Sequence, residues 1–155
     1  MNMVSSLSSS RLTHKVIDAL YLEAMVLADE ARAYFDDFSV DERHHMDPVI
    51  RVAFSCESLK VTTRLMHVMA WLLTQRAVVA GEMEATHPHN PSLRLGPIVQ
   101  TDADALKRLP PAAQTIITNS MDLFLRTKRI DAQLLAPETG ASPARALMQQ
   151  LERSF

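Results

Sequence analysis

Residues 47–81 read DPVIRVAFSCESLKVTTRLMHVMAWLLTQRAVVAG, and this stretch decides the fold. Asp47 followed by Pro48 is typical of a helix start, because aspartate caps the first turn and proline is tolerated within it. No proline or glycine follows until Gly81, which we expect to end the helix. We therefore predict one unbroken helix of about 34 residues, roughly 50 Å long, as the spine of the domain. Its buried side is predicted to consist of Ile50, Phe54, Val61, Leu65, Val68, Leu72, Val79 and Met83.

Two further long helices are predicted to pack on this spine. One should begin near the Ser8–Ser10 cluster and end at about Asp37 or Phe38, because its apolar residues recur every three or four positions. The other should begin at Pro110–Pro111, after a proline-containing loop over 84–100 and a short helix over 101–109 capped by its first residue. The apolar line of the first of these helices is Val16, Leu20, Ala24, Leu27, Ala31, Tyr34 and Phe38.

The predicted fold class is all-α, a bundle of three long helices with a short extra helix before the third long one. The bundle should span residues 11–136 and follow a flexible N-terminus at 1–10. Residues 137–155 should form a flexible tail with room for a short amphipathic helix, which is marginal alone in water. We expect this helix to dock on a partner or to pack on its own bundle through Leu147, Met148, Leu151 and Phe155.

Composition limits the classes of function. The chain has 155 residues, which suits one domain, and a net charge of −2, which gives no general attraction for nucleic acid. The longest apolar stretch without charge, 65–75, is too short to cross a membrane. The N-terminal ten residues lack the basic start and apolar core of a signal peptide, and Cys56 has no second cysteine to pair with. We therefore expect a cytoplasmic protein that binds neither nucleic acid nor membranes.

Two Glu-x-x-His motifs, Glu42–His45 and Glu84–His87, are the strongest hint of catalysis. Such pairs build di-iron centres in some four-helix bundles, where both residues project inward from the middle of a helix. Here Pro48 and Pro88 follow closely, so both motifs should lie in loops or at helix ends. We interpret the histidines as solvated and predict no catalytic residue, no metal and no other cofactor. A metal-dependent helical-bundle enzyme is the remaining enzymatic alternative.

Arg51 and Arg76 fall on the apolar side of the predicted central helix. A buried guanidinium needs a carboxylate partner, because an unpaired buried charge is costly. We therefore predict structural ion pairs with the first helix, which carries the acids Asp29, Glu30, Asp36 and Asp37.

The opposite side of the central helix carries a tryptophan among polar neighbours. Arg64, Trp71 and Val78 are seven residues apart, with His67 and Thr74 between them. A spacing of seven suits helix–helix association, so we interpret these residues as the interface of a homodimer. Packing of the same residues into the core by a slightly rotated helix is the alternative.

Residues 57–83, ESLKVTTRLMHVMAWLLTQRAVVAGEM, resemble the RcdA-like family (regulator of CtrA degradation, DUF1465) of alphaproteobacteria. The most specific parts are Glu57–Leu59, Thr62–Met66, Trp71–Leu73, Gln75–Ala77 and Gly81–Glu82. The resemblance implies a three-helix-bundle homodimer without enzymatic activity.

The resemblance also implies an adaptor for the ClpXP protease in cell-cycle-regulated proteolysis. Such an adaptor joins protease already primed by a response regulator and delivers substrates or further adaptors. The alternative from the residues is a helical scaffold or regulatory protein that binds another partner, with no protease involved.

Overall fold

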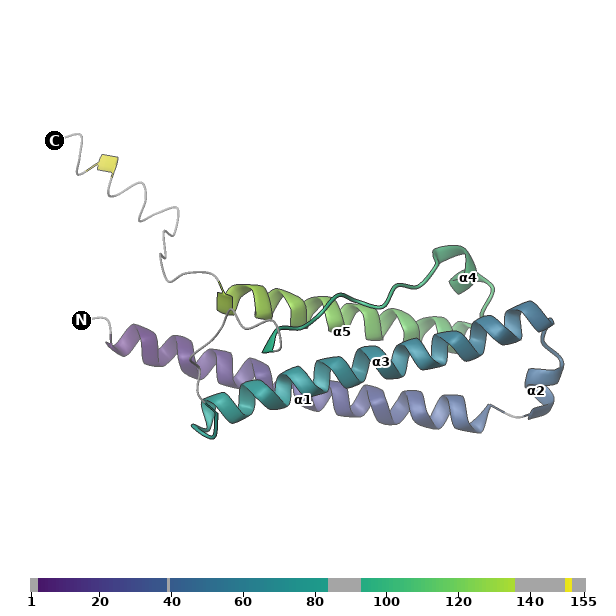
Figure 1. The fold of residues 1–155 in the computed structure, drawn as a ribbon, viewed down its shortest axis with the longest axis horizontal. Coiled ribbons are helices and arrows are strands. Elements are labelled where there is room, and N and C mark those ends of the chain that lie inside the picture. Colours follow the sequence, from purple (N-terminus) through teal and green to yellow (C-terminus); the bar gives the residue numbers. More distant parts are fainter. Residues whose placement is uncertain (1–2, 39, 84–92, 136–149, 152–155) are drawn as a thin grey trace.

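Three long helices form an elongated bundle in the computed structural model, which describes residues 3–38, 40–83, 93–135 and 150–151. Each long helix packs against the other two (Figure 1). The predicted all-α class is therefore confirmed, and none of the described residues lies in a strand. The helices are α1 (Met3–Asp37), α2 (Val40–His44), α3 (Pro48–Val79), α4 (Ala103–Lys107) and α5 (Pro111–Leu135).

Both ends of α3 are capped by the residues that the sequence indicates. The carboxylate of Asp47 accepts a hydrogen bond from the Val49 amide at 2.9 Å, and Pro48 is the first helical residue. Gly81 has a φ of 75°, a left-handed conformation that glycine adopts without steric cost. The amides of Gly81 and Glu82 then donate to carbonyls in the last turn, at 3.1 and 2.9 Å. The prediction of one unbroken helix is confirmed.

The first helix begins earlier than predicted. α1 starts at Met3 rather than at the Ser8–Ser10 cluster, so residues 3–10, predicted to be a flexible terminus, belong to the helix. No proline or glycine interrupts this stretch, and serine is only mildly unfavourable inside a helix. Four of the predicted apolar positions are buried, whereas Val16 is exposed and Ile17 takes its place in the core.

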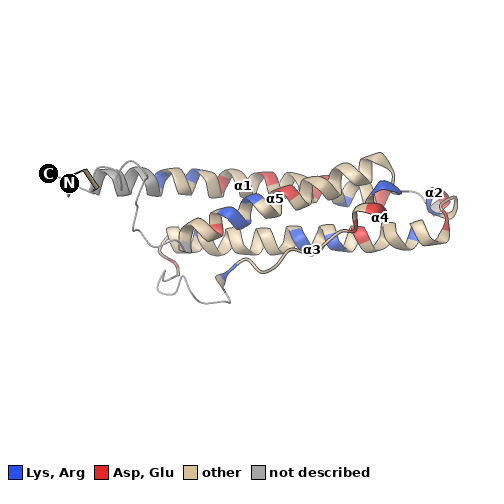
Figure 2. Ribbon diagram, turned by 90° about the horizontal axis from the view of Figure 1, so that it is seen from above, with Lys and Arg blue, Asp and Glu red and all other residues tan. Residues whose placement is uncertain are grey.

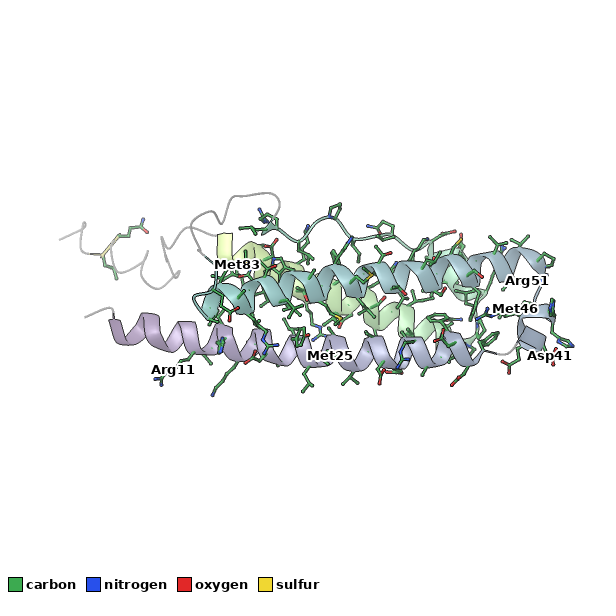
Figure 3. The ribbon with its side chains drawn as sticks, turned by 60° about the horizontal axis from the view of Figure 1, so that its bottom comes forward. Arg11, Met25, Asp41, Met46, Arg51 and Met83 are labelled. Atoms are coloured by element: carbon green, nitrogen blue, oxygen red, sulfur yellow. The ribbon has the colours of Figure 1, made fainter. Side chains whose placement is uncertain are left out.

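The core follows the predicted apolar line of α3 along most of its length. Five of the eight predicted positions are buried, namely Phe54, Val61, Leu65, Val68 and Leu72. Val79 and Met83, at the C-terminal end of the helix, are exposed instead. Figure 3 places Met83 near one end of the bundle and Arg51 and Met46 near the other.

An aromatic cluster closes the bundle where α1 ends and α3 begins. The Phe54 ring lies 4.6 Å from the Phe38 ring and 5.2 Å from the Phe35 ring, measured between centroids. The guanidinium of Arg43, in α2, donates to the Phe35 carbonyl at 2.6 Å and lies 6.0 Å from the Phe54 ring. The short helix α2 thus contacts the ends of both long helices and fixes the turn between them.

Residues 93–102, here called the strap, carry the chain along α3 and α5 before α4 begins (Figure 1). The predicted short helix is present as α4, but its cap is Asp102, whose carboxylate accepts from the Asp104 amide at 3.2 Å. Thr101, the predicted cap, is used elsewhere. No helix among the described residues is long and apolar enough to cross a membrane.

Phe54 tests the core most directly. We expect Phe54→Ala to lower the free energy of unfolding by about 3–5 kcal/mol, because it removes buried apolar contact and leaves a cavity in the aromatic cluster. Urea denaturation followed by circular dichroism at fixed protein concentration measures this loss. Leu22→Ala is the control, because Leu22 is 63% exposed and its truncation should change stability little. Equal effects of the two changes would contradict the assigned core.

Candidate functional site

Arg64 is fully buried in the middle of α3 although it carries a charge. Its Nε donates to the Val99 carbonyl at 2.9 Å, and its Nη1 donates to the Ser120 hydroxyl at 3.2 Å. Its Nη2 donates to the Thr101 hydroxyl. One side chain therefore joins α3 to the strap and to α5, three segments that are distant in sequence.

A buried carboxylate completes this network. The Thr101 hydroxyl donates to Glu57 Oε2 at 2.7 Å, and Lys60 Nζ donates to Glu57 Oε1 at 2.9 Å. Burial lowers the pKa of Arg64, and the nearby charge of Glu57 acts in the opposite direction. Because the ordinary pKa of arginine lies far above neutrality, the guanidinium stays charged. Thr101 bridges the two charges, since its hydroxyl accepts from one and donates to the other.

A second set of polar contacts fastens the other end of the strap. Asp131 of α5 is buried, and its carboxylate accepts from Trp71 Nε1 and from Arg94 Nε, each at 3.1 Å. Lys128 Nζ donates to the carbonyl oxygens of residues 95 and 96 at 3.1 and 3.0 Å. The strap is thus held at both ends by side chains of α3 and α5.

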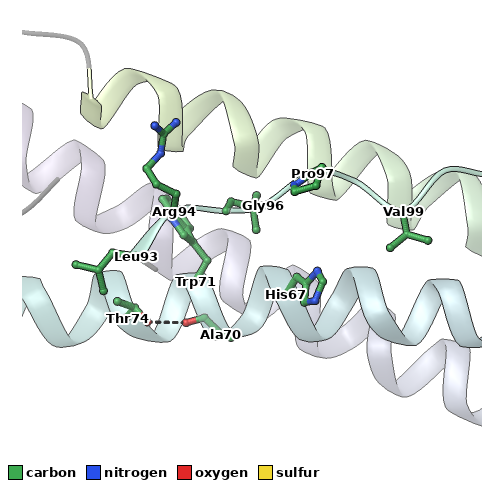
Figure 4. A pocket seen from close by; sticks show the side chains of 10 residues that line it. His67, Ala70, Trp71, Thr74, Leu93, Arg94, Gly96, Pro97 and Val99 are labelled. Carbon is green, nitrogen blue, oxygen red and sulfur yellow. Dashed lines mark hydrogen bonds between the residues drawn. The ribbon is translucent and has the colours of Figure 1, made fainter. Parts of the chain in front are cut away.

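A cavity of about 500 Å³ lies between the strap and α3 (Figure 4). Trp71, Thr74 and the exposed His67 line it from α3, opposite residues 93–97 of the strap. The Thr74 hydroxyl is committed to the Ala70 carbonyl at 2.9 Å. Thr74 therefore donates its hydroxyl proton to a backbone carbonyl of its own helix rather than to a general base.

The predicted dimer stripe is wrong in its orientation. Arg64 and Trp71 are buried in the single chain, and Thr74 and Val78 are half-buried, so these residues do not form an outward surface. Only His67 is exposed among them. The physical reason is that the strap and α5 cover this side of α3. The strap supplies the Val99 carbonyl to the guanidinium of Arg64, and α5 supplies the carboxylate of Asp131 to the indole of Trp71. The alternative of core packing is the one that the structure supports.

The two arginines predicted to form ion pairs have different surroundings. Arg76 Nε lies 3.4 Å from Asp18 Oδ1 of α1, and its guanidinium lies 4.9 Å from the Tyr21 ring. A carboxylate partner from the first helix is therefore present, but Arg76 is exposed rather than buried, and Asp18 is not among the acids expected. Arg51 is half-buried near the start of α3, and its ion pair stays a prediction.

The sequence analysis did not identify the buried polar residues of α5. Ser120, Thr127 and Asp131 are all buried in α5, and with Ile117 and Phe124 they recur every three or four residues. Polar residues at the spacing of a buried face are the signal that could have found them, because burial requires hydrogen-bond partners. The partners of Ser120 and Asp131 lie in α3 and the strap and cannot be identified from the local pattern, whereas the Thr127 hydroxyl donates within α5, to the Leu123 carbonyl.

Most of the other predicted sites lie outside the described residues. Of the two Glu-x-x-His motifs, Glu42–His45 is at α2 and Glu84–His87 is outside the described residues. Within the described part of the chain, no group of three potential ligands is close enough to hold a metal. Of the four predicted docking residues of the tail, only Leu151 is described, and it is exposed.

Comparison with known proteins adds a family and a solved relative. The chain matches the family model described as "Protein of unknown function (DUF1465)" over residues 8–155. It resembles the crystal structure of RcdA from Caulobacter crescentus CB15, at 29% sequence identity and a TM-score of 0.58. The match covers 76% of this chain and 88% of RcdA. No curated protein sequence matches. The resemblance inferred from residues 57–83 is confirmed.

Removal of the Arg64 guanidinium should weaken the fold and release the strap. We expect Arg64→Met to cost about 3–5 kcal/mol of unfolding free energy, because it leaves the Val99 carbonyl and the hydroxyls of Thr101 and Ser120 without their buried cationic donor. Urea denaturation measures this loss, and limited trypsin digestion should show faster cleavage after Arg94 in the loosened strap.

Arg32→Met is the matched control, because Arg32 pairs with Asp29 on the exposed surface of α1. It should leave both readings close to those of the unchanged protein. A strap that stays resistant to trypsin in Arg64→Met would show that Arg64 does not hold it.

Proposed function

The chain belongs to the DUF1465 family, and on this premise we propose that it is a non-enzymatic adaptor that delivers protein substrates or further adaptors to the ClpXP protease. The observation that carries the proposal is the structural similarity to RcdA, which extends over most of both chains. The family resemblance in residues 57–83 implies the same role.

The architecture supports a role in binding proteins. The bundle presents fixed surfaces, because its three long helices pack on one another and the strap is tied down at both ends. Basic and acidic residues are interspersed along the bundle in Figure 2, an arrangement that suits protein partners better than nucleic acid. The contacts described above include no activated nucleophile. These features suit an adaptor, which acts by holding two partners close together.

The partners follow from the same premise. The adaptor acts as a cytoplasmic homodimer and joins ClpXP that a response regulator has already primed. Delivery in this arrangement serves cell-cycle-regulated proteolysis. The tail, residues 137–155, docks on one of these partners through Leu147, Met148, Leu151 and Phe155.

Capture by an inactive protease tests this function. ClpP without its catalytic serine retains the proteins that ClpX translocates, so its contents in cells with and without this chain can be compared by mass spectrometry. We expect at least one protein to be retained only when the chain is present. Purified chain should also bind ClpX in the presence of the priming response regulator.

Identical contents in both strains, together with no binding to ClpX, would contradict the adaptor role. Stable binding of another protein without ClpX would instead favour the scaffold alternative. Stoichiometric iron or manganese in the purified protein would favour the enzymatic one.

Deletion of residues 137–155 should separate delivery from stability. We expect the melting temperature to change little, because α5, the last of the three long helices that form the core, ends at Leu135. The inactive protease should then retain less of at least one delivered protein. A full-length variant with serine at Leu147, Met148, Leu151 and Phe155 is the control for tail length and should behave like the deletion. Unchanged delivery would exclude a docking role, and a large loss of stability would place the tail in the core.

A further inference from the structure

The face of α3 that points away from the bundle is apolar along most of the helix. Four large apolar residues lie on it at intervals of seven: Val52, Leu59, Met66 and Leu73 are 63%, 68%, 64% and 47% exposed. Small residues alternate with them. The complete outer seam is Val52, Cys56, Leu59, Thr63, Met66, Ala70, Leu73 and Ala77.

The seam has the spacing of a helix–helix contact. Its members are four and three residues apart in turn, which keeps them on one side of the helix over about 38 Å. None of its eight positions carries a charge. Because the opposite face of α3 is buried by the rest of the chain, the helix is apolar on two sides. A helix of this kind is normally covered on both.

We propose that the outer seam binds the same seam of a second copy, with the two α3 helices antiparallel and the two-fold axis between Thr63 and Met66. This inference rests on the homodimer of the proposed function and assigns its interface. The outer seam replaces the predicted interface of Arg64, Trp71 and Val78, because these residues lie on the side of α3 that the strap covers.

The order of large and small residues in the seam is self-complementary. In the antiparallel register, Leu59 of one copy meets Ala70 of the other, and Met66 meets Thr63. Each remaining large residue likewise faces a small one, because Val52 meets Ala77 and Leu73 meets Cys56. Large side chains that face small ones interdigitate without voids. A parallel pair would place large residues on large ones and small residues on small ones, which packs poorly.

The charges beside the seam and the area that it can bury also favour a second copy of the chain as its binding partner. Beside the seam, Lys60 would meet His67 of the other copy and Arg76 would meet Ser55, so no two permanent charges of the same sign face each other. Contact along about 38 Å of helices roughly 10 Å wide removes accessible area on the order of 1,000 Å² in total. That area lies at the lower end of specific interfaces, and an isologous contact uses the same patch twice.

Oligomeric state tests the seam directly. Light scattering after size-exclusion chromatography of the full chain should give twice the mass of one chain. Met66→Lys should give monomers, because the new charge would be buried against the other copy. Val26→Lys is the matched control: Val26 is 60% exposed but belongs to α1, in a groove that α1 and α5 line without any residue of α3, so this variant should stay dimeric. A monomeric unchanged protein, or a dimer that survives Met66→Lys, would overturn the proposal.

The native cysteine tests the direction of the pairing. In the antiparallel register, Cys56 of one copy lies about 26 Å from Cys56 of the other but directly opposite residue 73. Leu73→Cys should therefore give a disulfide-linked dimer on mild oxidation, whereas the unchanged protein should not. Leu73→Cys combined with Cys56→Ser is the control and should lose the link. A link through Cys56 alone would show a parallel pair and overturn the antiparallel register.

Both measurements use the purified chain without protease. If the seam does not form a dimer, the experiments on delivery to the protease still test the adaptor role. If delivery is not observed, the mass and the cross-links of the purified chain still test the dimer.

Discussion

A charged guanidinium at the centre of a helical bundle is the constraint on which this structure depends. Arg64 has no contact with water, so the chain must supply its hydrogen-bond acceptors. Val99 and Thr101 supply two of them from the strap, and Ser120 supplies a third from α5. The position of the strap follows from this requirement. It covers one side of α3 and leaves the other side of the same helix open.

Much of the fold could be predicted because its signals are local. Asp47 and Pro48 start α3 and Gly81 ends it through interactions within a few residues, and the apolar spacing of the long helices is also a local property. The role of Arg64 could not be predicted in this way. Its acceptors lie 35 to 56 residues away, so within α3 it resembles an exposed residue in a polar stripe. The local pattern likewise predicts Thr101 as a helix cap, whereas its hydroxyl bridges Arg64 and Glu57, which lie 37 and 44 residues away in sequence.

These contacts give α3 two roles in the proposed adaptor. Its inner face holds the bundle and the strap together, and its outer seam remains for a second copy. Because α3 is apolar on both sides, the same helix stabilises the single chain and would form the interface of the proposed dimer. In the proposed adaptor each copy would contribute one tail, so the dimer would offer two of the proposed docking segments to the protease and its clients and raise their effective local concentration.

The most direct test of this account is an NMR measurement of the Arg64 side chain in the full-length protein. A proton–nitrogen correlation spectrum of the guanidinium region should contain a slowly exchanging Nε–H signal that disappears in Arg64→Lys. Nuclear Overhauser contacts from this proton to Val99 and Thr101 should place it against the strap. A fast-exchanging Arg64 Nε–H without such contacts would show that the strap is not held by this side chain and would contradict the account.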